Sequence, residues 1–259
     1  MLLAVDVGNS ETSFGLFEGK TLLHHWRITS SPRQTRDELL VHLHALLESR
    51  SHHARDVTDL AVSCVVPDLT PAYRELGELM TEKGRTLIID HRSVPDLKIL
   101  HLDPATVGPD RIVNAVASAK LYGKPSIVVD LGTATTLDVI GRNGEYVGGV
   151  IAPGILTAAN ALFARGARLA RVEVTPPSRI VGRTTEESMQ AGIFFGAVYA
   201  VDGLVAAIMK EQEFPAGTPV VATGGLAVAV QQASQYITGV NLDLTLEGIR
   251  IIYEGFSTN

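Results

Sequence analysis

Apolar and polar residues alternate along this chain with two different periods, which together predict strands interleaved with helices. Short runs rich in valine, isoleucine and leucine end at glycine, proline or acidic residues, as is typical of buried strands. Longer segments repeat their apolar residues at helical spacing, as amphipathic helices do. The strands are predicted at 2–7, 59–67, 85–90, 126–131 and 218–223, and the main helices at 38–50, 70–82, 111–123, 155–165 and 184–210.

One strand–turn–strand pattern occurs twice, once in each half of the chain. Residues 2–17 read LLAVDVGNSETSFGLF and residues 126–140 read SIVVDLGTATTLDVI, each with an apolar run followed by Asp-Xaa-Gly. The alignment that pairs Asp6 with Asp130 also pairs Gly8 with Gly132, Asn9 with Thr133 and Thr12 with Thr136. A repeat of this length predicts two similar domains, at 1–124 and 125–259, whose acidic turns point into one cleft. Because each copy is a hairpin, we expect an α/β fold with mixed β-sheets flanked by helices.

The composition limits the class of protein. The 259 residues are 46% hydrophobic and carry a net charge of −6 without a basic stripe, which argues against an extended nucleic-acid surface. The single cysteine, Cys64, excludes an internal disulfide, and we expect it to be a small buried hydrophobe in a reducing compartment, the cytoplasm. The first residues lack the pattern of a secretory signal. The apolar segment 193–209 contains Asp202, so we expect a buried helix there rather than a membrane span.

The first acidic turn has the residue types of a phosphate-binding loop. Gly8 lets the backbone turn sharply after a strand and approach a ligand. Backbone N–H groups and the side chains of Asn9, Ser10 and Thr12 suit phosphate oxygens, while the Asp6 carboxylate suits Mg²⁺ with bound water. An ordinary hairpin with a capping aspartate is the alternative, and the second copy of the pattern disfavours it. The chain contains neither a Walker loop nor a Rossmann fingerprint.

Gly108-Pro109-Asp110-Arg111 is the candidate reaction centre. An acidic residue in the first turn of a helix is stabilised by the helix dipole, which alone would explain Asp110. Arg111 is not stabilised there, so it needs a partner or an anion. An aspartate beside an arginine at the end of a polar loop also suits a general base with an anion-orienting group, and the spacing leaves both explanations open. The eight histidines show no metal-binding spacing.

Several segments, taken together and in order, resemble type III pantothenate kinase, a bacterial family of the actin-like, sugar-kinase-like ATPase superfamily. The set spans nearly the whole chain and comprises DVGNSETS at 6–13, SCVVP at 63–67, GPDR at 108–111, DLGTATT at 130–136, GGVIAPG at 148–154, the two threonines at 184–185, ATGG at 222–225 and LTLEGIRIIYE at 244–254. Each segment alone is a weak signal, but the ordered set is highly specific.

The resemblance implies two actin-like (ribonuclease H-like) domains and ATP-dependent phosphorylation of pantothenate to 4′-phosphopantothenate, the first step of coenzyme A biosynthesis. Asp110 would be the general base for the primary hydroxyl. The residues implied to bind ATP are Asp6, Val7, Gly8, Asn9, Ser10, Glu11, Thr12, Ser13 and Thr133. The residues implied to bind pantothenate are His101, Gly108, Pro109, Asp110, Arg111 and Thr185.

The resemblance also implies cofactors and a partner. The cofactors are Mg²⁺ at Asp6 and a monovalent cation, K⁺ or NH₄⁺, at Asp130. The partner is a second copy of the chain, with the glycine- and alanine-rich helix after Thr185 as the candidate interface, whereas no nucleic acid or membrane is expected. The family commonly has a tyrosine where His101 stands, which puts the role of position 101 in doubt. Pro109 stands where a small residue such as alanine is common, which could alter the approach to Asp110 slightly.

Three other functions compete with this one. A sugar kinase of the same superfamily is the nearest, although the zinc-binding cysteine cluster of one such group is missing from a chain with one cysteine. A non-catalytic regulatory protein on the same scaffold is disfavoured by Asp6, Asp110 and Asp130, which are all present. An actin-like ATPase that assembles or moves is disfavoured by the short chain and by the loop at 108–111.

Overall fold

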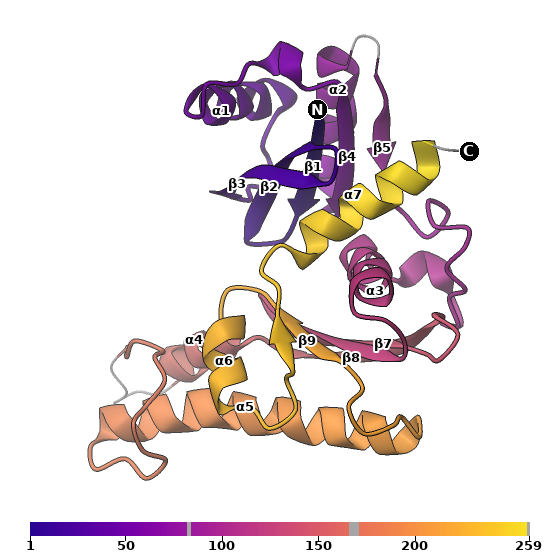
Figure 1. Cartoon of the computed structure of the whole chain (residues 1–259). Coiled ribbons are helices and arrows are strands. Elements are labelled where there is room, and N and C mark those ends of the chain that lie inside the picture. The colour runs from indigo at the N-terminus through magenta and orange to yellow at the C-terminus, as the bar shows by residue number, and fades with distance from the viewer. Residues whose placement is uncertain (82–83, 166–170, 258–259) are drawn as a thin grey trace. The chain divides into compact units, whose positions relative to one another are not determined.

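A computed structural model describes residues 1–81, 84–165 and 171–257 (Figure 1). Contacts divide the chain into an N-terminal unit, Met1–Ala117 with Asp243–Asn259, and a C-terminal unit, Ser118–Leu242. The division expected from the repeat runs at 1–124 and 125–259, and the two divisions differ mainly in the last helix. That helix, α7 (Leu244–Ser257), packs on strands of the N-terminal unit.

The N-terminal unit contains a five-stranded mixed sheet in the order β3-β2-β1-β4-β5. β1, β2 and β3 form an antiparallel meander, and β4 and β5 extend the sheet in parallel from β1. The strands and helices of this unit, besides α7, are β1 (Leu2–Val7), β2 (Glu11–Glu18), β3 (Thr21–Thr29), α1 (Arg36–Glu48), β4 (Asp59–Cys64), α2 (Thr70–Met80), β5 (Thr86–Ile88) and α3 (Pro109–Leu121), which continues into the C-terminal unit.

The C-terminal unit repeats this topology strand for strand. Its sheet has the order β10-β9-β6-β7-β8, again with a three-stranded meander followed by two parallel strands. Its elements are β6 (Ser126–Leu131), β7 (Ala134–Ile140), β8 (Tyr146–Pro153), α4 (Ile155–Arg165), α5 (Thr185–Glu211), β9 (Val220–Thr223), α6 (Ala227–Ala233) and β10 (Gly239–Val240). The expected α/β fold with two similar mixed sheets is therefore confirmed.

Apolar side chains on each sheet pack against helices of the same unit. In the N-terminal unit, leucines of α1 and the residues Tyr73 and Leu76 of α2 cover β1 and β4. In the C-terminal unit, one side of α5 covers β6 and β9 through Phe194, Val198 and Val201. Burial of this apolar area is the main stabilising contribution in each unit.

Two strands end earlier than the pattern predicts. β4 stops at Cys64 rather than near 67, because Pro67 has no N–H to continue a ladder and begins a short 3₁₀ turn. β5 comprises only Thr86–Ile88 of the predicted 85–90, since only three residues pair with β4. Both strands lie on the parallel side of the sheet.

The helix α5 is long and apolar enough to pass a test for a membrane span, and it is the one helix among the described residues that does so. Its buried side packs on the sheet of its own unit. Asp202, also buried, accepts hydrogen bonds from Ser234 Oγ and from the Gln235 N–H, where the Asp202 Oδ2–N distance is 2.9 Å. The acidic residue within the apolar run thus secures the chain after α6. The helix is buried along one side only, which is less than the sequence predicts.

Candidate functional site: two acidic turns and a helix start

The first acidic turn is a tight connection between β1 and β2. The last paired residues are Val7 and Thr12, and the Gly8 N–H donates to the Glu11 carbonyl at 3.0 Å. A Cβ at Gly8 would lie 2.9 Å from that carbonyl oxygen, so the turn closes only around glycine. Asp6 is half-buried at the strand end, whereas Asn9, Ser10 and Glu11 are exposed. The turn therefore presents polar side chains to solvent beside a carboxylate.

A buried hydroxyl pair supports this turn from below. Thr12 is fully buried, and its Oγ1 lies 2.8 Å from Ser30 Oγ. The Ser30 N–H also donates to the Ser10 carbonyl at 3.0 Å. These two hydrogen bonds fix the exposed turn to the end of β3, which is the kind of rigidity that a phosphate site needs. Ser30 has no counterpart in the sequence motifs, so the sequence analysis missed it.

The second acidic turn, between β6 and β7, is one residue shorter. Leu131 pairs with Thr135, and the Gly132 N–H donates to the Ala134 carbonyl at 3.1 Å. Thr135 pairs with Leu131 as Thr12 pairs with Val7, so it occupies the register position that Thr12 has in the first turn, and both threonines are buried. The sequence alignment of Thr12 with Thr136 is therefore wrong by one residue. An ungapped alignment cannot detect a deletion inside the turn.

Two glycines from separate segments close around the second turn. A Cβ at Gly154 would lie 2.4 Å from the carbonyl oxygens of both Gly132 and Thr133. The Gly154 N–H and Thr157 Oγ1 donate to the Thr133 carbonyl at 3.2 Å and 2.6 Å. Gly224, with a φ of +92°, would place a Cβ 2.6 Å from the Leu131 carbonyl oxygen. The glycine-containing segments 148–154 and 222–225 therefore pack against this turn because they lack side chains there.

The start of α3 holds the third acidic group. Asp110 is half-buried, and its Oδ1 accepts the Arg111 backbone N–H at 2.8 Å. Burial raises the pKa of the Asp110 carboxyl, and the Arg111 N–H and the Arg111 charge oppose this rise. A Cβ at Gly108 would lie 2.5 Å from Asp110 Oδ1. Glycine at this position thus leaves room for the carboxylate to turn back over the helix end.

α3 is fixed firmly within the N-terminal unit. Ile112, Val113 and Ala115 are fully buried. A Cβ at Gly248 of α7 would lie 2.5 Å from the Val113 carbonyl oxygen, so the two helices cross closely. Close packing of this kind holds the Asp110 backbone in place, and sequence reasoning gave no signal for it.

Sequence comparison identifies the family that carries these features. A model of the family described as type III pantothenate kinase matches residues 2–207. Relatives named type III pantothenate kinase include proteins from Myxococcus xanthus, 44% identical over 98% of both chains, and from Halalkalibacterium halodurans, 39% identical over 98% of this chain and 99% of the other. The chain belongs to the type III pantothenate kinase family. The reaction of this family is transfer of phosphate to pantothenate, the first step of coenzyme A biosynthesis.

Solved structures agree on the fold of this pantothenate kinase family member. A Campylobacter jejuni protein titled as a Baf family transcriptional activator has a TM-score of 0.60 at 18% identity, covering 99% of this chain and 100% of the other. A Clostridium difficile activator of 2-hydroxyisocaproyl-CoA dehydratase, solved with bound ADPNP, has a TM-score of 0.58 at 12% identity, covering 99% and 96%. At these identities the likeness concerns the fold alone, and it confirms the expected actin-like, sugar-kinase-like architecture.

The remaining predicted site residues lie on both units. Asp130 is half-buried at the end of β6 and Thr133 is exposed in the turn that follows. Thr185 is the exposed first residue of α5, whose N-cap, Thr184, accepts the Glu187 N–H through its side chain. His101 is exposed, with its Nδ1 3.0 Å from the Asp103 carbonyl oxygen. Asp6, His101 and residues 108–111 belong to the N-terminal unit, and Asp130, Thr133 and Thr185 to the C-terminal unit.

The donor atoms suit the implied cations. Carboxylate oxygens are the ligands that Mg²⁺ prefers, and Mg²⁺ keeps several waters and substrate oxygens rather than filling a protein cage. Asp6, half-exposed at its strand end, fits that requirement, and Asp130 offers the same chemistry in the second unit. Among the described residues, no group of three or more His, Cys, Asp or Glu side chains is placed to hold a metal. A site for these cations would therefore need oxygens from substrate and water as well.

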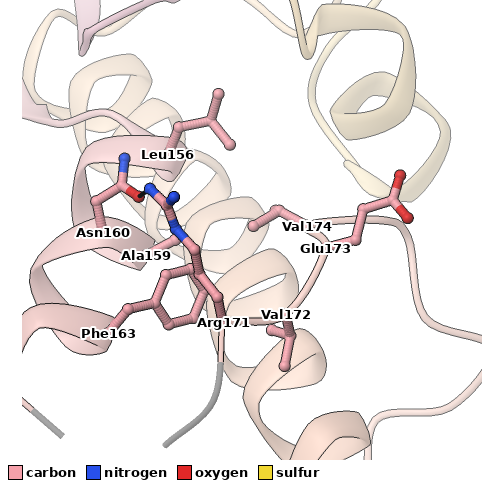
Figure 2. Close-up of a pocket in the computed structure, with 8 residues that line it drawn as sticks. All are labelled: Leu156, Ala159, Asn160, Phe163, Arg171, Val172, Glu173 and Val174. Atoms are coloured by element: carbon pink, nitrogen blue, oxygen red, sulfur yellow. Dashed lines mark hydrogen bonds between the residues drawn. The ribbon is translucent and has the colours of Figure 1, made fainter.

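Cys64 and a cavity beside α4 lie outside this chemistry. Cys64 is half-buried rather than fully buried as expected, and it packs against the N-terminal core. Its thiol donates to the Val66 carbonyl at 3.1 Å, and burial raises the pKa of the thiol, so it stays protonated. The cavity, about 320 Å³, lies between α4 and the segment 171–174, where Arg171 donates to Asn160 Oδ1 at 2.9 Å (Figure 2). None of the predicted site residues lines it.

Proposed function

We propose that this chain transfers the γ-phosphate of ATP to the primary hydroxyl of pantothenate and that Asp110 takes the hydroxyl proton. The family assignment supports the reaction, and the state of Asp110 supports its role. A carboxylate whose pKa is raised by burial is a stronger base, and general bases work best with a pKa near the operating pH. The oxygen–phosphorus bond to pantothenate forms, the bond to ADP breaks, and the proton moves from the hydroxyl to Asp110.

Phosphoryl transfer depends chiefly on positioning and on neutralising charge. In this proposal residues 6–13 and Thr133 bind ATP, with the exposed Asn9 and Ser10 and the turn backbone near the phosphates. Asp6 would hold Mg²⁺, and Asp130 would hold K⁺ or NH₄⁺. Such cations supply positive charge beside the phosphates, which matters because the chain has no Walker lysine.

Pantothenate would be bound by residues around the base. Gly108, Pro109 and Arg111 adjoin Asp110 in the sequence, and Arg111 can orient an anionic group. Thr185 lies at the N-terminus of α5, where backbone N–H groups and the helix dipole favour a carboxylate. His101 is exposed in the polar loop before α3, so it has room to contact substrate in place of the family tyrosine.

The protein would act as a cytoplasmic homodimer. The outward side of α5 carries Gly192, Gly196 and Gly203, where an added Cβ would meet no atom within 4 Å, and Tyr199, which is 53% exposed. An apolar helix face with small residues allows close approach of a second helix. The same face in two copies would form a symmetric interface, the commonest arrangement of homodimers.

A sugar kinase of the same superfamily and, from a different class, a non-catalytic regulatory protein are the alternatives. Their scaffolds are related, since a Thermus thermophilus hexokinase has a TM-score of 0.51 at 16% identity and the Campylobacter jejuni neighbour is titled a transcriptional activator. One assay separates them: ADP release with pantothenate or with hexoses, each with and without K⁺. The proposal requires turnover with pantothenate that rises with K⁺. Turnover with hexoses alone, or with neither substrate, would contradict it.

A further inference from the structure

Two histidines from separate segments of the N-terminal unit meet outside the proposed active site. His24 lies in β3, and His52 lies in the loop after α1. Their Nε2 atoms are 3.2 Å apart, and their ring centroids are 5.1 Å apart with the ring planes at 59°. Both side chains are half-buried. Neither has a part in the proposed phosphate transfer.

The separation of the two nitrogens is that of two ligands on one metal ion. Imidazole nitrogens bind transition metals such as zinc at about 2.0–2.1 Å. An ion at that distance from both Nε2 atoms would subtend an N–metal–N angle of about 100°, near the tetrahedral value. If both rings pointed at that ion, their centroids would be about 5.0 Å apart, which agrees with the 5.1 Å observed. The same 3.2 Å separation also permits an N–H···N hydrogen bond between the two rings, so the experiment must separate the two cases.

The surroundings of the pair limit how tightly it can bind a metal. The charge of Arg50, which acts on His24, opposes a bound cation. Because no third such ligand is grouped with the pair in the described chain, water must complete the coordination.

We propose that His24 and His52 form a two-imidazole site for a divalent transition metal, with Cu²⁺ bound more tightly than Zn²⁺. This order follows from the general preference of nitrogen sites for Cu²⁺. Binding would connect β3 to the loop after α1 and would stabilise the folded N-terminal unit, because the metal would bind the folded state and not the unfolded one. The site is separate from the proposed active site and does not depend on its assignment.

The only tryptophan of the chain gives a direct readout. Trp26 lies with its ring centroid 5.4 Å from that of His24, and Cu²⁺ at the pair would quench its fluorescence. Titration of the untagged protein with CuCl₂ is expected to give saturable quenching at one equivalent. Zn²⁺, which does not quench, is expected to restore the fluorescence by competition.

Matched variants separate this site from other copper binding. His24→Gln and His52→Gln should each weaken the apparent Cu²⁺ affinity by more than about tenfold, since even the loss of a group that only supports a ligand costs that much. His44→Gln, on the exposed side of α1, is the control and should bind as the wild type does. His52 lies in a loop, so His52→Gln remains informative if His24→Gln disturbs the strand.

Either of two results would overturn the proposal. One is quenching that never saturates. The other is an equal affinity in the wild type and in His52→Gln, with both proteins folded by circular dichroism. In either case the two rings share a hydrogen bond only.

Discussion

Replacing Gly108 by alanine should displace the Asp110 carboxylate without harming the fold. The new Cβ would lie 2.5 Å from Asp110 Oδ1, whereas ordinary contact begins at 3.4 Å, so the oxygen must move by about 0.9 Å. The obstructing atom is the end of a side chain, which can rotate at little cost in stability. A displacement of about 1 Å in a reacting group can lower the rate by about 10²-fold, so kcat with pantothenate should fall by that order.

The pH profile should shift in the same variant. Burial raises the pKa of Asp110, and a carboxylate that moves toward water loses part of that rise. The base works only when it is deprotonated. The acidic limb of the kcat/KM profile should therefore move to lower pH in Gly108→Ala than in the wild type.

A coupled assay of ADP release across a pH series measures both effects. Gly255→Ala in α7 is the matched control, because a Cβ there would meet nothing within 4 Å. That variant should keep the wild-type kcat and pH profile. If Gly108→Ala also kept them, with an unchanged Tm, the position of the Asp110 carboxylate would not govern the reaction and the reasoning would be refuted.

Three further substitutions test the structure around the turns. Gly154→Ala should lower the free energy of unfolding by about 1–3 kcal/mol and raise the KM for ATP, because the new Cβ would lie 2.4 Å from two carbonyl oxygens of the second turn. An unchanged Tm in a thermal melt would contradict this packing. Asp202→Ala should cost about 1–3 kcal/mol in urea unfolding, since it leaves Ser234 and Gln235 without their acceptor, and an equal midpoint would count against that anchor. Asp110→Asn should become more stable relative to the wild type as pH rises. In the wild type, a carboxyl whose pKa is raised by folding makes the free energy of unfolding fall between its unfolded pKa of about 3.9 and its folded pKa, whereas asparagine does not titrate. A difference in unfolding free energy that does not change with pH would contradict the raised pKa.

The local pattern of the sequence predicted most elements because it is set by burial period and turn residues. The hairpins around Gly19 and Gly144 form where the sequence places glycine, and both glycines have positive φ. α3 begins at Pro109 rather than at the predicted residue 111, because proline suits the first helical turn.

What the sequence could not predict depends on contacts between distant segments. The support of the first turn by Ser30 and the closure of the second by Gly154 join residues that no local pattern connects. The packing of α7 on the N-terminal sheet depends on the absence of a side chain at Gly248, opposite the Val113 backbone. The missing residue in the second turn became visible only from strand register.

Turnover of Asp110→Asn with ATP and pantothenate tests the central claim most directly. Asparagine keeps the size of the side chain and can still accept the Arg111 N–H, but it cannot take a proton. Formation of 4′-phosphopantothenate, followed by mass spectrometry, should slow by about 10²–10⁴-fold while ATP affinity stays close to that of the wild type. Near-normal product formation by this variant would remove Asp110 from the reaction.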